Sequence, residues 1–252
     1  KSSDTARTPS KTAGGKRIVV LDAGHGGIEP GTSSSGGMHE QDLVLDVVKR
    51  VRDKLKGRGN YKVYLTRDDD TYIPLRQRVR IARSYDADLF VSIHADSNPS
   101  ASVYGASVYT LSESGSDKEA AALAAKENQS DVIAGVDLSN EDTAVGSILI
   151  DLAQRDTMNR SSRFAETAVS QLRSATDILP RQPHRSAAFA VLKAPDVPAV
   201  LIELGYLSNA SDAQQMGTTR WRDNVAEAIA AAIDRNFGTT RGAVTASQDA
   251  SD

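Results

Sequence analysis

The sequence predicts an α/β protein with a mixed, largely parallel sheet, helices on both faces of the sheet, and a helical insertion. Short apolar runs rich in β-branched residues alternate along the chain with segments whose apolar residues recur at helical spacing. Strands that alternate with helices form sheets covered on both faces. Residues 113–178 contain no strand-like run, and this stretch is the predicted insertion.

The expected strands are apolar runs that end at polar or turn-forming residues. The first is Arg17-Ile-Val-Val-Leu21, and the most apolar of the later ones include Leu89-Phe-Val-Ser-Ile93 and Ala199-Val-Leu-Ile202. Together the expected strands cover residues 17–22, 61–66, 88–93, 105–111, 189–192 and 199–204.

Helical spacing of apolar residues predicts helices at residues 41–56, at 74–84 and near the end of the ordered chain. Gly57 is the expected stop of the first helix, and Pro74 suits the first turn of the second. The last helix carries an apolar stripe and ends at Gly238. That stripe consists of Trp221, Val225, Ala228, Ile229, Ala232 and Ile233.

The insertion is expected to hold an Ala-rich helix at residues 117–126, a polar link at 128–142 and a longer helix. An insertion of this length between two strands is more often functional than filler. The longer helix has an apolar stripe formed by Val145, Ile148, Leu149, Leu152 and Ala153.

Composition limits the class of protein. The chain has 252 residues, 39% hydrophobic and 25% charged, with a net charge of −3, and these values fit a globular protein and disfavour a general nucleic-acid binder. No apolar run approaches the roughly 20 residues of a membrane span. Cysteine is absent, which excludes disulfides and thiol catalysis. We expect one domain at 16–238 between polar tails at 1–15 and 239–252, with no signal peptide in the chain as given.

Three chemically active side chains follow three expected strands. His25 lies in a Gly-rich loop after the first strand, His94 ends another, and Glu203 ends a third. Carboxyl ends of parallel strands are where α/β proteins build sites. Glu40 lies at the expected start of a helix, near the same edge. Two histidines and one carboxylate suit a catalytic zinc site, although residue types alone leave iron or a cadmium-like ion open.

Simpler interpretations exist for each of these residues. Glu40 alone is explained by the positive end of a helix dipole, and His94 by a hydrogen-bonded core position. His39 is a rival ligand beside Glu40. His184 could contact substrate or belong to a surface loop. Arg67 and Arg78 are expected to be structural ion-pair partners.

Four motifs follow one another along the chain: Asp22-Ala-Gly-His-Gly-Gly27, Gly37-Met-His-Glu40, Ser92-Ile-His-Ala-Asp96 and Pro198-Ala-Val-Leu-Ile-Glu203-Leu-Gly-Tyr-Leu-Ser-Asn209. In this order they resemble the zinc-dependent N-acetylmuramoyl-L-alanine amidases of the amidase-3 type. The resemblance covers about residues 16–238, and Thr66-Arg67 and Leu75-Arg-Gln-Arg78 also match.

This resemblance implies cleavage of the amide between N-acetylmuramic acid and L-alanine of peptidoglycan. It implies that His25, Glu40 and His94 bind Zn²⁺ and that Glu203 is the catalytic carboxylate, acting as general base and then as acid toward the leaving amine. His39 is set aside because the match falls on Glu40. The rival hypotheses are a related zinc peptidase cutting the stem peptide, and an inactive wall-binding module.

The insertion resembles that of the Gram-negative periplasmic cell-division amidases, where a helical regulatory segment covers the active site. The matching stretches are Lys126-Glu-Asn-Gln-Ser-Asp131, Gly135-Val-Asp-Leu138 and Ile150-Asp-Leu-Ala-Gln154. By this match Glu127 is an inhibitory fourth zinc ligand, with Glu119 and Glu141 as substitutes.

The same resemblance implies a partner and a compartment. A LytM-type coiled-coil activator would dock on the stripe around Val145–Leu152. We expect a periplasmic monomer that splits septal peptidoglycan, with residues 1–16 as the remnant of a linker to a wall-targeting region.

Overall fold

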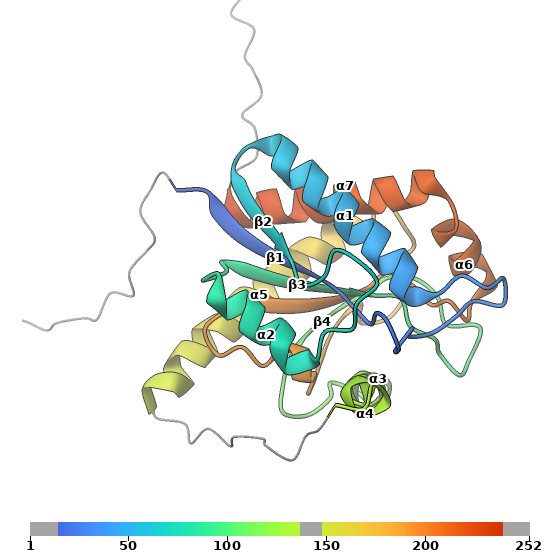
Figure 1. Ribbon diagram of the computed structural model, residues 1–252, viewed down its shortest axis with the longest axis horizontal. Helices are drawn as coiled ribbons and strands as arrows, with labels where there is room; N and C mark the ends of the chain where they lie inside the picture. Colours follow the sequence, from blue (N-terminus) through green and yellow to red (C-terminus); the bar gives the residue numbers. More distant parts are fainter. Residues whose placement is uncertain (1–14, 137–147, 239–252) are drawn as a thin grey trace, which may run out of the picture.

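A computed structural model describes residues 15–136 and 148–238, and in the helix that begins at Ile148 the side chains are described from residue 154 onward. The elements follow the expected alternation of strands and helices (Figure 1). In chain order they are β1 (Arg17–Ala23), α1 (Glu40–Arg58), β2 (Tyr61–Leu65), α2 (Leu75–Ser84), β3 (Leu89–His94), β4 (Ser107–Leu111), α3 (Lys118–Glu127), α4 (Ser130–Ile133), α5 (Ile148–Leu172), β5 (His184–Ala187), the 3₁₀ helix η1 (Ala190–Leu192), β6 (Ala199–Glu203), α6 (Ala210–Met216) and α7 (Thr219–Phe237).

The strands form one mixed sheet in the order β2-β1-β3-β6-β4-β5. Strands β2, β1, β3 and β6 run parallel, β4 is antiparallel to β6, and β5 is parallel to β4. The carboxyl ends of β1, β3 and β6 therefore lie side by side at one edge of the sheet. The predicted fold class is confirmed.

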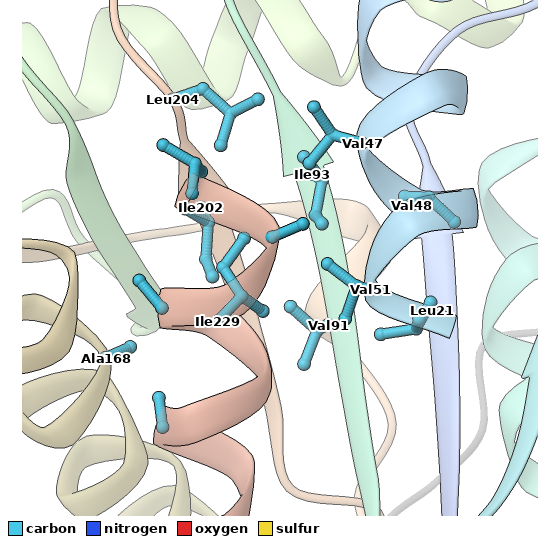
Figure 2. Packing of buried hydrophobic residues seen from close by; sticks show 14 of the residues in the cluster. Leu21, Val47, Val48, Val51, Val91, Ile93, Ala168, Ile202, Leu204 and Ile229 are labelled. Atoms are coloured by element: carbon cyan, nitrogen blue, oxygen red, sulfur yellow. The ribbon is translucent and has the colours of Figure 1, made fainter. Parts of the chain in front are cut away.

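Helices α1, α5 and α7 cover one face of the sheet. Leu21, Val91 and Ile202, at alternate positions of β1, β3 and β6, are fully buried under them. Figure 2 shows Val51 of α1 and Ile229 of α7 pointing into this layer. Each such side chain contributes roughly 1.5–3 kcal/mol on burial, so this layer firmly anchors the strands whose ends carry the expected site.

The opposite face packs against α2, α3 and η1. The intervening residues of the same strands, Val20, Phe90 and Leu201, are buried there. Because both faces are covered, the central parallel strands form nearly continuous apolar runs rather than alternating ones, which is why they stood out in the sequence.

Several boundaries differ from expectation. Helix α1 continues past Gly57 to Arg58 and is capped by Gly59, which takes a left-handed φ of 80° and donates its N–H to Lys56 O. The prediction of a strand at 189–192 is wrong. Most of this run forms η1, which packs in the core beside α2. A short apolar run fits a buried turn as well as a strand. The strand in this region is the polar β5, and α4 and α6 were also not predicted.

The insertion contains α3 and α4 and returns to the sheet through α5, and no strand occurs among its described residues. We call α3 and α4 together (Lys118–Ile133) the lid. Residues 137–147, which include the end of the expected polar link at 128–142, and the side chains of the stripe Val145–Ala153 lie outside what the structure describes.

Candidate active site

His25, His94 and Glu203 meet at one edge of the sheet because β1, β3 and β6 are neighbouring parallel strands. His94 and Glu203 are the last residues of their strands and are paired in register. His25 follows β1 in a loop whose Gly24 N–H bonds Ile93 O at 3.1 Å. Glu40 is the first residue of α1 and is fully buried at the same edge. The four residues that the motifs singled out are thus brought together.

Glu127 reaches the same point from the end of α3. His25 Nε2, His94 Nδ1 and Glu127 Oε2 lie within 4.8 Å of one another, at separations of 3.1, 3.2 and 3.6 Å. Glu40 Oε1 lies 3.0 Å from His25 Nε2 and 3.4 Å from His94 Nδ1. A tetrahedral zinc ion with bonds of 2.0–2.1 Å has ligand atoms about 3.3–3.4 Å apart. The measured separations bracket that value.

Glu127 Oε2 is buried and has no hydrogen-bond partner among the described residues, although His94 Nδ1 is 3.2 Å away. The two atoms are close without the geometry of a hydrogen bond, as expected when both face a common point. The clustered carboxylates of Glu29, Glu40 and Glu127 add buried negative charge that a bound cation would offset. This donor set fits a divalent metal.

Glu29 is a functional candidate that the sequence interpretation missed. Its Oε2 lies 2.5 Å from His25 Nδ1, on the side of the ring opposite to Glu40. A carboxylate on the second ring nitrogen fixes the tautomer and orientation of a metal-binding imidazole. The signal was present, since Glu29 lies four residues after His25, but the loop had no regular periodicity from which to infer its path.

Two glycines allow the rings and carboxylates to approach the backbone. A Cβ on Gly24 would lie 2.4 Å from His94 Cε1, and a Cβ on Gly31 would lie 2.7 Å from both Glu40 Oε2 and His25 Cδ2. His25 itself has a φ of 59°, which non-glycine residues seldom adopt. The loop is therefore shaped around the histidine at a cost in backbone strain.

A buried ion pair beneath the loop supports that conformation. Arg78 donates to Asp22 Oδ1 at 3.0 Å and to His25 O at 2.9 Å, and Asp22 also accepts hydrogen bonds from Thr66 and Ser92. Arg67 donates to the carbonyl of Ala23 at 3.0 Å and to that of Gly24 at 2.8 Å. Arg78 is thus an ion-pair partner as expected, whereas Arg67 binds backbone carbonyls, two of them at the end of β1.

The electrostatics of the site shift the pKa values of its carboxyl groups in opposite directions. Burial lowers the pKa of His25, but Glu40, Glu127 and Glu29 outweigh burial and raise it to about 10. Burial alone raises the pKa of Glu40, but His25 and His94 outweigh it and hold the pKa well below the usual range. For Glu203, burial dominates and raises the pKa well above the usual range. Divergent carboxyl pKa values in one site are typical of groups with different roles.

Glu203 is fully buried and held by one hydrogen bond. Its Oε2 accepts from the N–H of Asp96 at 3.0 Å, while Oε1 has no partner among the described residues. An unpartnered buried carboxylate oxygen is costly unless it serves a function. Its position beside His94 suits a group that accepts and returns a proton next to a metal.

The lid is fixed mainly by polar contacts. Asn128 donates to Ala188 O at 2.9 Å and accepts from Ala190 N at 2.7 Å. Asp131 Oδ1 accepts from the hydroxyl of Tyr72 at 2.8 Å and from Leu75 N at 2.9 Å. These contacts hold the end of α3 so that Glu127 faces the two histidines.

His184 is not brought to this cluster. Its Nε2 lies 3.1 Å from Thr110 Oγ1, and it is paired with Val108, which packs in the layer under α5, on the other face of the sheet from His94. His39 faces Ser33 Oγ at 2.8 Å and precedes α1. Glu119 is exposed and pairs with Arg185, and Glu141 lies outside the described residues.

The parallel strands of this mixed sheet bring two histidines, clustered buried carboxylates and a separate buried acid to one edge, an arrangement typical of metal-dependent hydrolases. The chain belongs to the family described as N-acetylmuramoyl-L-alanine amidase, Amidase_3, which matches residues 19–235. It is therefore an enzyme of this class, with peptidoglycan as its substrate. The predicted family and enzyme class are confirmed.

Relatives and solved structures agree with this assignment. The amidase AmiA of Escherichia coli (strain K12) is 38% identical over 233 residues, 92% of this chain and 80% of AmiA. AmiC of Escherichia coli O6:H1 (strain CFT073) is 39% identical over 87% of this chain, which spans about half of AmiC (52%). The structure of AmiC2 from Nostoc punctiforme has a TM-score of 0.67 at 27% identity, covering 90% of this chain and 99% of that one.

Proposed function

We propose that this amidase hydrolyses the muramoyl–L-alanine amide with a zinc ion held by His25, Glu40 and His94, and that Glu127 keeps it inactive until the lid moves. The observation that carries the proposal is the approach of Glu127 Oε2 to both imidazole nitrogens, at 3.2 and 3.6 Å. A lid residue therefore occupies the position that an open catalytic metal site leaves for water or substrate.

The donor atoms support zinc over harder ions. Imidazole nitrogens suit zinc, whereas magnesium and calcium prefer oxygen ligands throughout. Glu29 would orient His25, since it lies on the other ring nitrogen. When bound, zinc supplies Lewis-acid chemistry, polarising the scissile carbonyl and making water more acidic.

Glu203 is proposed as the proton carrier. Its free Oε1 takes a proton from the attacking water and returns it to the amide nitrogen. Water oxygen joins the carbonyl carbon of the lactyl group, and the C–N bond breaks. The products near neutral pH are a carboxylate on muramic acid and an ammonium on L-alanine, so one water balances the reaction.

The position of Glu127 supports the proposed autoinhibition. A carboxylate in the fourth position excludes the attacking water, so turnover requires displacement of α3. A partner that shifts the lid from about 1% to about 99% open must bind the open state roughly 10⁴-fold more tightly, or about 5.5 kcal/mol. We propose that this partner is a LytM-type coiled-coil activator that engages the insertion.

The setting follows from the substrate and the relatives. Peptidoglycan lies outside the cytoplasmic membrane, so we propose that the enzyme acts in the periplasm, on septal peptidoglycan during daughter-cell separation. Among the described residues, no helix is long and apolar enough to span a bilayer.

Product analysis tests the proposed activity. Purified peptidoglycan digested with the zinc-loaded chain should yield glycan strands without stems and free peptides beginning with L-alanine. Shortened stems still attached to muramic acid would instead support the rival stem peptidase. The chain treated with a chelator should lose activity and regain it with added zinc.

The wall-binding alternative predicts a different result for the Glu203→Ala variant. An inactive module would bind peptidoglycan and perform its role with Ala at this position, whereas the proposed enzyme loses turnover while retaining zinc. Zinc content by metal analysis, measured beside hydrolysis on the same sample, separates the two.

A further inference from the structure

A second lid residue enters the active site beside Glu127. The Lys126 ammonium pairs with the Asp96 carboxylate, and it lies 3.2 Å from Ser97 Oγ and 3.5 Å from Thr32 Oγ1. Asp96 is 1% exposed, and the hydroxyls of Thr32 and Ser97 bond each other at 2.9 Å. A buried carboxylate and two hydroxyls therefore surround the Lys126 ammonium, and we call these three residues the amine pocket (Thr32, Asp96, Ser97).

The amine pocket belongs to the segments that build the reaction centre. The backbone N–H of Asp96 donates to Glu203 Oε2 at 3.0 Å, and the N–H of Thr32 donates to Glu40 Oε2 at 3.0 Å. A group seated in this pocket is thus next to the acid that protonates the leaving nitrogen. Amide hydrolysis releases its two products side by side, one anionic and one cationic.

We propose that the amine pocket receives the amino group of L-alanine as it leaves, and that Lys126-Glu127 closes the enzyme as a mimic of both products. Glu127 stands for the muramic acid carboxylate and Lys126 for the alanine ammonium. The inference rests on the proposed function and deepens it. It makes Asp96 a substrate-binding residue and gives the lid two inhibitory charges rather than one.

A purely structural role for Asp96 has a different consequence. If Lys126 only neutralises a buried acid, the pocket has no preference among ligands once the lysine is removed. If the pocket takes an ammonium, a peptide with a free amino terminus binds and the same peptide acetylated there does not. Charge-assisted hydrogen bonds of this kind are worth about 1.5–3 kcal/mol, which is roughly tenfold or more in affinity.

The test compares inhibition of peptidoglycan hydrolysis by the dipeptide L-alanyl-D-glutamate, free or N-acetylated. In the zinc-loaded Lys126→Met variant, the free dipeptide should inhibit about tenfold more strongly than the acetylated one. Lys118→Met, at the exposed start of the same helix, is the matched control and should show weaker inhibition by the free dipeptide. Adding Asp96→Asn to Lys126→Met should erase the difference in inhibition between the two dipeptides. The substitution keeps the backbone N–H of residue 96, which donates to Glu203.

Equal inhibition by the two dipeptides in Lys126→Met, or a preference that survives Asp96→Asn, overturns the inference while leaving the amidase intact. If Asp96→Asn does not fold, Ser97→Ala in the same background replaces it, and a preference unchanged by Ser97→Ala counts against the pocket. Digests without free L-alanine amino termini would overturn the proposed function and this inference with it.

Discussion

His94 and Glu127 approach one another to 3.2 Å from regions that are held in different ways. His94 ends a strand buried on both faces, between the layers of α1, α5 and α7 and of α2 and η1. Glu127 ends α3, whose other buried residues are mostly small, namely Ala120, Leu123 and Ala124. Alanine buries little apolar area, so the lid gains much less from packing than the strand does.

The lid relies instead on hydrogen bonds, such as those of Asn128 and Asp131. Each such hydrogen bond contributes a net stabilisation of about 0.5–1.5 kcal/mol, because hydrogen bonds to water replace it when the lid opens. Under the proposed autoinhibition, this difference lets one site combine a fixed catalytic side with a removable inhibitory side. Substitutions in the two regions should therefore have separable effects.

The largest effect is expected on the fixed side, from Glu203→Ala. Loss of the proton carrier should lower the turnover number by about 10²–10⁴. Zinc content should stay unchanged, and the thermal midpoint should change little, because removing a buried oxygen without a partner among the described residues offsets the loss of the hydrogen bond from Asp96 N–H. Hydrolysis, metal analysis and calorimetry on one preparation test this, and retained turnover would contradict the role of Glu203.

Asp22→Asn should destabilise the fixed side. Breaking its buried pair with Arg78 should lower the free energy of unfolding by about 3–5 kcal/mol, measured by urea titration. The matched control is Asp196→Asn, whose partner Arg83 is exposed, and there the loss should stay below about 1 kcal/mol. Similar losses in the two variants would show that the buried pair does not support the fold.

Glu127→Ala should act on the lid side alone. Removing the carboxylate from the metal position should raise basal hydrolysis about tenfold or more, since a charge-assisted contact is lost. Glu119→Ala, at an exposed position of the same helix, should leave basal hydrolysis near its original level. Unchanged hydrolysis in a folded Glu127→Ala variant would argue against autoinhibition by this residue.

Asn128→Ala should give a smaller change of the same sign. Its side chain bonds Ala188 O and Ala190 N, and losing these bonds should open the lid enough to raise basal hydrolysis about two- to tenfold. Gln129→Ala is the neighbouring control. A fall in hydrolysis would show that Asn128 supports the active conformation instead.

The smallest expected effect is on the stability of the fold at low pH. Burial alone would raise the pKa of Asp22, but Arg78, Ser92 and Thr66 outweigh burial and hold the pKa below its usual value. The native pKa is thus lower than the unfolded one. The associated stability is complete above about pH 4 and is lost as the pH falls through the native pKa. Urea titrations below pH 4 should show a flatter dependence for Asp22→Asn than for Asp196→Asn.

The sequence predicted the fixed side of the site better than the lid. His25, His94 and Glu203 follow apolar runs, and because parallel strands share an edge their meeting could be inferred from order alone. Glu29 and Asp96 could not be placed, since their partners depend on how a glycine loop and a helix fold back in three dimensions. His184 failed to join the cluster because β5 turns its side chain to the other face.

The connections of the lid set a limit on how activation works. Helix α3 is joined to β4 by residues 112–117, and the insertion returns to the sheet through α5, which packs against α7. A displaced lid therefore stays close to the site, at an effective concentration that short linkers bring to about the millimolar range. Under the proposed autoinhibition, no free inhibitor is released on opening, so the block would re-form as soon as the proposed partner departs. Activity would then last only while that partner stays bound, and it would be confined to the places where the partner is held.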